Sequence, residues 1–164
     1  MYTETEFDLH KLKKRNVKIL EAGRSCVHED YRDGKIIRLL WRGLSSYISQ
    51  KNVDFIVGCA SFEGCNIGSF LEELSFLHHN HLAPKKYLAK SLKNKTTKIK
   101  YLKKDDIDNL KIFKSLPPLI KAYLRVGSWI GQGAVIDNEF KTTDVCIILK
   151  ADKINTKYLN MANK

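Results

Sequence analysis

The chain has 164 residues, of which 43% are hydrophobic and 29% are charged, and this composition suits one globular domain over residues 1–164 with a buried core. No apolar run approaches the roughly 20 residues that a membrane-spanning helix needs. The net charge of +11 excludes an acidic protein and predicts attraction to acidic partners, such as nucleic acid, anionic lipid or an acidic carrier protein.

Residues 17–27 alternate and are rich in Val, Ile and Leu, which predicts a β-strand. In unbroken alternation Glu21 shares a face with Ile19, and Arg24 lies on the opposite face. A bulge at Gly23 would realign the two faces. The strand therefore predicts a carboxylate and a guanidinium close to its carboxyl end.

A helix is predicted over residues 35–50 because Ile37, Leu40, Leu44, Tyr47 and Ile48 form an apolar stripe at helical spacing. Val53–Ala60 is a short apolar run that predicts a buried strand. The order strand, helix, strand predicts a right-handed crossover between parallel or splayed strands.

The second half of the chain mixes helices and strands, which predicts an α/β fold of the α+β type with a mixed sheet. Two prolines at 117 and 118 suit a helix start, and Gly127 suits its end. The other predicted elements are a helix over 68–81, a loop with short helical pieces and nine lysines over 84–104, a short helix over 105–114, and strands over 129–135 and 143–149 joined by a turn at 137–138.

The turn from Tyr31 to Ile36 precedes the first predicted helix and is a candidate anion site. The first N–H groups of a helix lack partners, and the helix dipole favours negative charge there. Arg32, Lys35 and Arg38 add cations. A solvated helix face is the alternative interpretation of these three side chains.

Two side chains just upstream suit acyl transfer to an amine. A carboxylate such as Glu21 can take the proton of an attacking amine, directly or through water. Arg24 can hold a phosphate or a carboxylate through two hydrogen bonds. The alternatives are an edge-strand salt bridge for Glu21, and a structural bridge from Arg24 to Glu21, Glu29 or Asp30.

Five blocks in order resemble the GNAT acyltransferase superfamily and, more narrowly, the ornithine-acyl-carrier-protein N-acyltransferases that start ornithine-lipid synthesis, a group often labelled hemolysins. The blocks are Glu21–Leu44, Gly58–Phe62, Leu77–Pro84, Leu116–Gly127 and Phe140–Val145. Three strands and two helices normally precede the first block. The resemblance therefore implies an N-terminally truncated acyltransferase domain that lacks the first three strands.

The resemblance implies roles for individual residues. Glu21 would be the general base and Arg24 the substrate anchor. The acyl-donor site would comprise Cys26, Val27, Arg32, Asp33, Gly34, Lys35 and Ile36. The usual motif has a second small residue where Ile36 stands, so only Gly34 fits. This departure favours acyl-phosphopantetheine, with one phosphate, over acyl-coenzyme A, and no tightly bound cofactor is expected.

The implied reaction moves a fatty acyl group, commonly 3-hydroxylated, from acyl-carrier protein to the α-amine of ornithine. The expected location is the cytoplasm, with peripheral contact at the anionic inner membrane face. A related N-acyl amino acid or acyl-homoserine-lactone synthase would share the donor and differ in the amine. A truncated, inactive remnant that binds membranes or nucleic acid is the alternative from another class.

Other polar clusters favour packing over chemistry. No metal is expected at His78, His79 and His81, because adjacent histidines on a helix point apart and no other ligand stands at the right spacing. Cys26 and Cys59 are expected to be reduced core thiols. Nucleic acid is not favoured for the lysine-rich segment, since only Tyr87 and Tyr101 interrupt it.

Overall fold

A mixed β-sheet forms the centre of the protein, for which a computed structural model describes residues 1–24, 26–31 and 35–154. Strand β2 runs parallel to β3, and β7 pairs antiparallel with β3, β5 and β6. The strands are β2 (Ile19–Glu21), β3 (Phe55–Glu63), β5 (Trp129–Ile130), β6 (Val135–Asp137) and β7 (Thr142–Lys150). The predicted mixed α/β fold is therefore confirmed.

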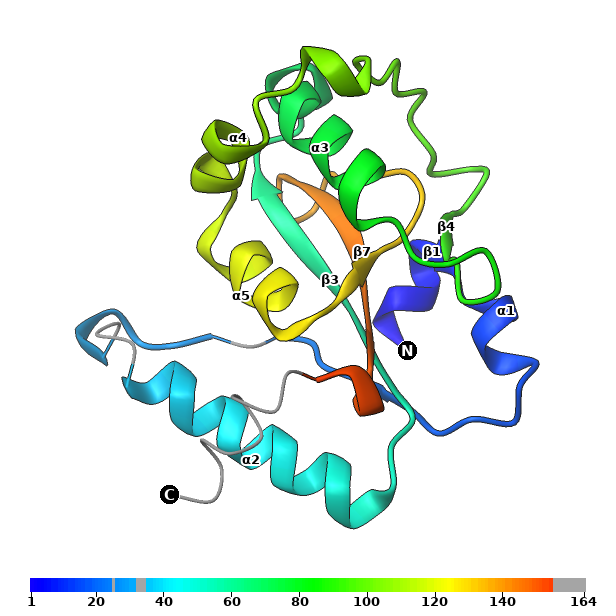
Figure 1. Cartoon of the computed structure of the whole chain (residues 1–164), viewed down its shortest axis with the longest axis vertical. Helices are drawn as coiled ribbons and strands as arrows, with labels where there is room; N and C mark the ends of the chain where they lie inside the picture. The colour runs from blue at the N-terminus through cyan, green and yellow to red at the C-terminus, as the bar shows by residue number, and fades with distance from the viewer. Residues whose placement is uncertain (25, 32–34, 155–164) are drawn as a thin grey trace.

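Helices cover one face of the two long strands, and the N-terminal segment covers the other (Figure 1). Helices α3, α4 and α5 lie together over β3 and β7, whereas α2 lies apart across the end of the sheet. The helices are α1 (His10–Lys13), α2 (Lys35–Lys51), α3 (Leu71–His81), α4 (Asn109–Ser115) and α5 (Pro118–Val126). A small sheet pairs β1 (Phe7–Asp8) with β4 (Lys90–Ser91).

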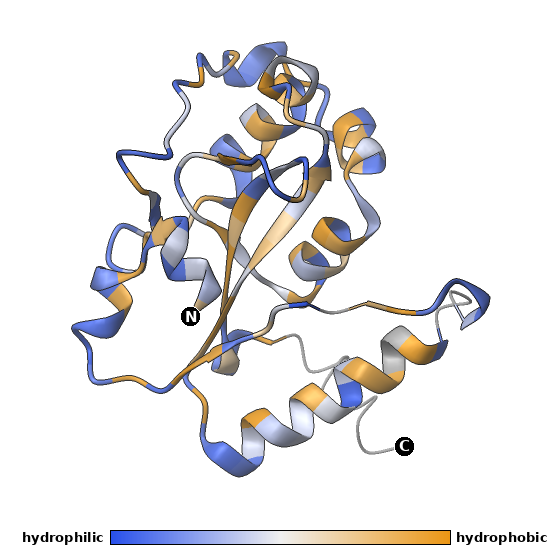
Figure 2. Cartoon of the chain, turned by 180° about the vertical axis from the view of Figure 1, so that it is seen from behind, coloured by the Kyte–Doolittle hydropathy of each residue, from blue (hydrophilic) through white to orange (hydrophobic). Residues whose placement is uncertain are grey.

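From Phe55 to Ala60, β3 is apolar on both faces because both faces are covered there, whereas Ser61 and Glu63 near its end are exposed (Figure 2). Ala60 and Phe62 of β3 pack toward α3 and α5, whereas Phe55 and Val57 pack against Phe7 of the N-terminal segment. Helix α2 inserts Ile48 into a third cluster with Ile56 and Leu149. Two apolar layers thus hold a continuous sheet between them.

Local signals fix the helix ends, which for α5 lie where the sequence predicts, whereas α4 begins at Asn109 and not at residue 105. The Asp108 carboxylate accepts hydrogen bonds from the N–H groups of Leu110 and Lys111 and so begins α4. Helix α5 begins at Pro118 and ends before Gly127, whose φ of 100° lies in the left-handed region. These short-range signals act without help from the rest of the chain.

Three further predicted segments differ from the structure. The strand predicted over 129–135 is divided into β5 and β6, with residues 131–134 in neither. The strand predicted over 17–27 is confined to Ile19–Glu21, because the chain leaves β3 after the Ala22 N–H bonds the Val57 carbonyl at 2.8 Å, and Arg24 adopts a left-handed φ of 55°. The loop predicted over 84–104 contains β4, which pairs with β1. Among the described strands, β2 lies at an edge of its sheet.

Gly58 permits the close approach of β2 to β3. A Cβ atom added to Gly58 would lie 2.5 Å from the Ala22 carbonyl oxygen, a backbone atom that cannot swing aside. A side chain here would push the end of β2 away from β3.

We predict that Gly58→Ala lowers the free energy of unfolding by about 1–3 kcal/mol, the usual effect of overpacking. Gly43→Ala is the matched control, since an added Cβ there meets nothing within 4 Å and the residue lies inside α2. The control should raise stability by about 0.4–1 kcal/mol. Urea unfolding followed by circular dichroism measures both; equal effects would show that the Gly58 contact is unimportant.

Candidate active site at the end of strand β2

Two pockets meet where β2 ends. One, of about 570 Å³, lies between the end of β2, α2 and α5, and the other, of about 490 Å³, lies on the opposite side of β2, toward the N-terminal segment. Glu21 and Gly23 line both. The end of β2 is therefore a wall shared by two cavities of different chemistry.

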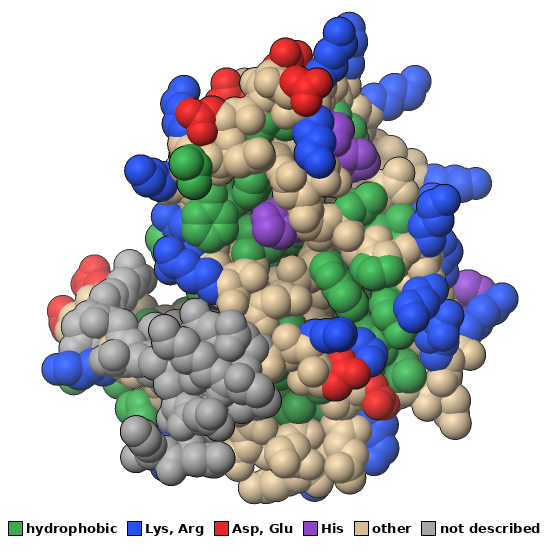
Figure 3. All heavy atoms as spheres, viewed as in Figure 1, with side chains coloured by type: hydrophobic (Ala, Val, Ile, Leu, Met, Phe, Trp, Pro, Cys, Tyr) green, Lys and Arg blue, Asp and Glu red, His purple; other side chains and the backbone are tan. Residues whose placement is uncertain are grey.

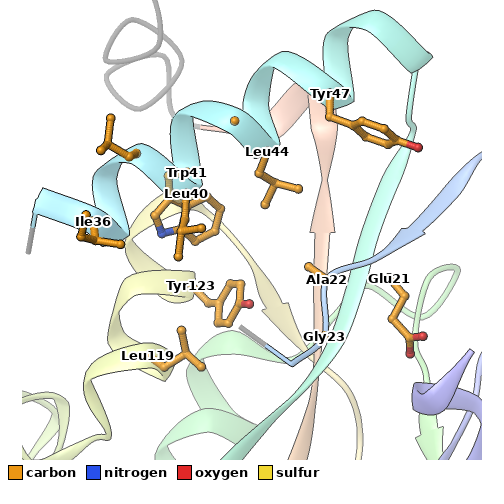
Figure 4. A pocket seen from close by; sticks show the side chains of 12 residues that line it. Glu21, Ala22, Gly23, Ile36, Leu40, Trp41, Leu44, Tyr47, Leu119 and Tyr123 are labelled. Carbon is orange, nitrogen blue, oxygen red and sulfur yellow. The ribbon is translucent and has the colours of Figure 1, made fainter. Parts of the chain in front are cut away.

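The first pocket, called here the apolar pocket, is built mainly from hydrocarbon and aromatic side chains. Figure 4 shows Leu40, Trp41 and Leu44 of α2 directed toward Tyr123 and Leu119 of α5. Its remaining lining residues are Ala22, Ile36, Leu39, Gly43 and Tyr47. Leu39, Leu40 and Tyr47 are exposed, so α2 presents an unfilled apolar surface.

The second pocket, called here the polar pocket, carries charged and hydroxyl side chains. Glu21 and Arg24 contribute from the end of β2, Cys59 and Ser61 from β3, and Asp144 from β7. Its other lining residues are Tyr2, Thr3, Phe140 and Thr142. The pairings Glu21 with Val57 and Ser61 with Asp144 place these acids on one face of the sheet.

Glu21 points away from the apolar pocket and toward the N-terminal segment (Figure 4). Its carboxylate accepts hydrogen bonds from the Tyr2 N–H at 2.9 Å and from both the N–H and the hydroxyl of Thr3 at 2.5 Å. Burial acts to raise the pKa of Glu21, but these hydrogen bonds outweigh it and lower the pKa. Glu21 is therefore ionised at neutral pH.

Arg24 lies beside Glu21 in the polar pocket, although simple alternation predicts opposite faces. The predicted realignment of the two side chains is found, but the chain turns after β2 has ended, with a left-handed backbone at Arg24, and not through a bulge within the strand. Within the described ranges Arg24 forms no ion pair, so the predicted bridge to Glu21, Glu29 or Asp30 is not formed there. Its exposed guanidinium can meet an anionic ligand group.

The predicted donor residues are only partly placed. Ile36 lines the apolar pocket, but Cys26, Val27 and Lys35 line neither pocket. Cys26 is exposed, which corrects the expectation of a core thiol; it lies in the irregular segment after β2 rather than in a strand. Arg32, Asp33 and Gly34 lie outside the described residues.

Sequence reasoning missed a buried cluster of Glu6, Cys59 and Asp144. One ligand atom from each lies within 4.8 Å of the others, and the Cys59 thiol donates to Glu6 Oε2 at 3.2 Å. Burial raises the pKa of all three groups. An acid inside the apolar run 143–149 was the available signal; its partners lie 85 to 138 residues away along the chain and could not be inferred.

The three histidines make packing contacts. His78 stacks on Tyr101 with ring centroids 4.0 Å apart, and His81 packs against Phe76. His79 Nε2 lies 2.8 Å from the Leu102 carbonyl oxygen. Their arrangement ties α3 to the lysine-rich segment.

None of the helices in the described parts of the chain combines the length and apolar character needed to cross a bilayer. Lys and Arg side chains stand around the rim of the face in Figure 3, including the upper and right edges. The lysine-rich segment 84–104 runs beside α3, at the end of the molecule away from α2 (Figure 1).

Comparisons with known proteins point to acyl transfer. Residues 1–42 match the acetyltransferase (GNAT) domain family. The chain is 40% identical over 161 residues to the L-ornithine N(alpha)-acyltransferase of Brucella abortus, covering 97% of this chain and 57% of that protein. Proteins of the same name from Rhodobacter capsulatus and Agrobacterium fabrum are 34% and 37% identical, covering 96% and 97% of this chain.

The chain spans somewhat more than half the length of these curated relatives, with 60% and 55% of the latter two proteins covered. No solved structure matches it. The similarity extends over nearly all of the chain and thus includes both pockets.

The buried acids predict that stability falls as pH rises. Glu6 and Asp144 have raised pKa values in the folded state, so folding binds protons that the unfolded chain releases above about pH 4. The contribution of these two protonated acids to the free energy of unfolding is complete at pH values below their pKa in the unfolded chain. It is lost as the pH rises through their pKa in the folded state. Asp144→Asn should therefore melt at a higher temperature than wild type at pH 7, and the difference should vanish near about pH 3.

Thermal melts between about pH 3 and pH 8 measure this difference. Asp105→Asn, the same change at an exposed position, is the control and should melt like wild type throughout. If Asp144→Asn melts lower than wild type at pH 7, an ionised Asp144 stabilises the fold, and our assignment of its raised pKa is wrong.

Proposed function

We propose that this chain contributes the transfer site of an N-acyltransferase that moves a (3-hydroxy)fatty acyl group from acyl-carrier protein to the α-amine of ornithine, in ornithine-lipid biosynthesis. The observation that carries the proposal is that an apolar and a polar pocket meet at Glu21 and Gly23. The similarity to proteins named L-ornithine N(alpha)-acyltransferase supports the reaction type and the acceptor.

Acyl transfer to an amino acid needs this combination of surfaces. The amine nitrogen attacks the thioester carbonyl, a C–N bond forms, the C–S bond breaks, and the thiol of the carrier leaves. A hydrocarbon chain is stabilised by apolar walls, whereas a charged amino acid requires polar partners. Holding both against one wall supplies the proximity that such a reaction needs.

In this proposal Glu21 accepts the proton that the attacking amine loses, directly or through a water molecule. Its three hydrogen bonds keep it ionised and therefore able to accept. The exposed Arg24 anchors the acceptor carboxylate from the same pocket. Ile36, at the start of α2, borders the apolar pocket, so the phosphopantetheine arm would enter beside the first turn of α2.

Acyl-phosphopantetheine on the acidic carrier protein is the proposed donor, with no tightly bound cofactor. The net charge of +11 would attract both that carrier and the anionic membrane into which a lipid product is released. An N-acyl amino acid or acyl-homoserine-lactone synthase would use the same apolar pocket; the names of the relatives favour ornithine. A non-catalytic basic module would bind through surface charge and would not require two adjoining pockets, so the pockets favour an enzyme.

A first prediction tests the apolar pocket. Leu40→Asp places a carboxylate in its wall and should weaken binding of a long-chain acyl-pantetheine at least about tenfold, because a charge against hydrocarbon is costly. Binding of acetyl-pantetheine should change little. Leu110→Asp, on α4 and 79% exposed, is the control and should bind both like wild type. Calorimetric titration measures each; equal loss for both ligands would contradict an acyl-chain site.

A second prediction tests the proton acceptor. Glu21→Gln keeps the shape and the hydrogen-bond acceptor but removes the base, and should lower turnover about 10²-fold or more. Affinity for acyl-carrier protein should stay nearly unchanged. Mass spectrometry of N-acylornithine gives the rate, with the chain assayed alone and with the uncovered part of the Brucella relative supplied as a second polypeptide. Wild-type turnover in the variant would remove Glu21 from the mechanism.

A further inference from the structure

The floor of the polar pocket holds an unused acceptor. Asp144 is only 4% exposed, and its Oδ1 atom has no hydrogen-bond partner among the described residues. Burial raises the pKa of Asp144, and the nearby hydroxyls of Thr142 and Ser61 act to lower it, although the Thr142 hydroxyl has no partner of hydrogen-bond geometry among the described residues. Leaving a buried carboxylate oxygen unpaired is costly, so the pair is suited to a donor that arrives from outside.

A second carboxylate lies behind Asp144 and adds negative charge. Glu6, 1% exposed, is held by the Cys59 thiol at 3.2 Å and by the Tyr2 hydroxyl at 3.3 Å. Across the described ranges, no Lys, Arg or His forms an ion pair with either acid. The pocket floor therefore holds two acids that receive no counterion from that part of the protein.

An alkylammonium suits this floor better than a metal ion does. An ammonium group offers three N–H donors to carboxylate and hydroxyl oxygens. Hard cations prefer about six or more oxygen ligands, whereas this cluster provides two carboxylates and a thiol. Burial and the nearby Glu6 raise the pKa of the Cys59 thiol, which keeps it protonated and a poor metal ligand.

We propose that Asp144, with Thr142 beside it, binds the second ammonium group of a dibasic amino acid acceptor and so selects ornithine over amino acids with neutral side chains. The inference rests on the proposed function, since it takes the polar pocket to be the acceptor site. Arg24 in the same pocket would hold the carboxylate. The α-amine would then face Glu21, and only the side-chain ammonium would reach the floor.

Calorimetric titration of the purified chain with L-ornithine and L-2-aminopentanoate tests this inference, because the second compound has the same carbon skeleton without the side-chain ammonium. Wild type should bind ornithine roughly tenfold or more tightly than 2-aminopentanoate, as a charge-assisted hydrogen bond predicts. Asp144→Asn should bring the ratio of the two dissociation constants close to one, because it should weaken the binding of ornithine and leave that of 2-aminopentanoate unchanged. Thr142→Val should reduce the ratio less, and Asp105→Asn, which makes the same change at an exposed site, should leave it as in wild type.

Several results would overturn the inference. Suppose that Asp144→Asn and Thr142→Val both melt cooperatively and keep the wild-type ratio of affinities for ornithine and 2-aminopentanoate. In that case these residues do not select the side-chain ammonium, but the proposed acceptor site is not contradicted. If wild type binds neither compound, the inference fails together with the proposed acceptor site. If Asp144→Asn abolishes binding of Zn²⁺ or Mg²⁺ to the chain while the ornithine preference persists, the cluster is a metal site instead.

Discussion

The pairing of β2 with β3 ends where the Ala22 carbonyl oxygen lies against the Cα of Gly58, and both pockets begin at that point. Because Gly58 has no side chain, β2 can stay in register up to Glu21 and then turn sharply through Gly23. The lack of a Cβ atom at Gly58 therefore lets β2 carry Glu21 to the point where the apolar pocket and the polar pocket meet.

The N-terminal segment is bound to the same carboxylate. The first N–H groups of a short helix lack partners within the helix, and Glu21 accepts those of Tyr2 and Thr3. The contact satisfies two backbone donors, and it also lowers the pKa of the proposed base. A weaker base is a slower proton acceptor, so the contact opposes the proposed chemistry while it holds the segment in place. Loosening Tyr2 and Thr3 would make Glu21 more basic and open the polar pocket at the same time, since both residues line it.

Sequence patterns predicted those helices whose position depends on interactions between residues close together in the chain. Helix α2 follows from its apolar stripe, and α5 follows from Pro118 and Gly127, because periodicity and backbone preference act within a few residues. The length of β2 could not be predicted, since Gly58, which permits its close approach to β3, lies 36 residues from Ala22 along the chain. Glu21 and Arg24 were predicted as neighbours only through a break at Gly23. The acid cluster was missed because Glu6, Cys59 and Asp144 come from three separate segments that only the folded sheet brings together.

The face of the sheet that carries the polar pocket changes character along β3. At Phe55 and Val57 it packs against Phe7 in a dry core, and two to four residues later it presents Cys59 and Ser61 beside Asp144. A fold that only had to be stable would continue the apolar pattern, because two buried acids that find no counterion among the described residues oppose folding at neutral pH. Natural sequences break such local rules chiefly at functional sites. The ammonium group of a ligand would act as a counterion for these acids. Binding of a cationic acceptor would then offset the free-energy cost of burying them.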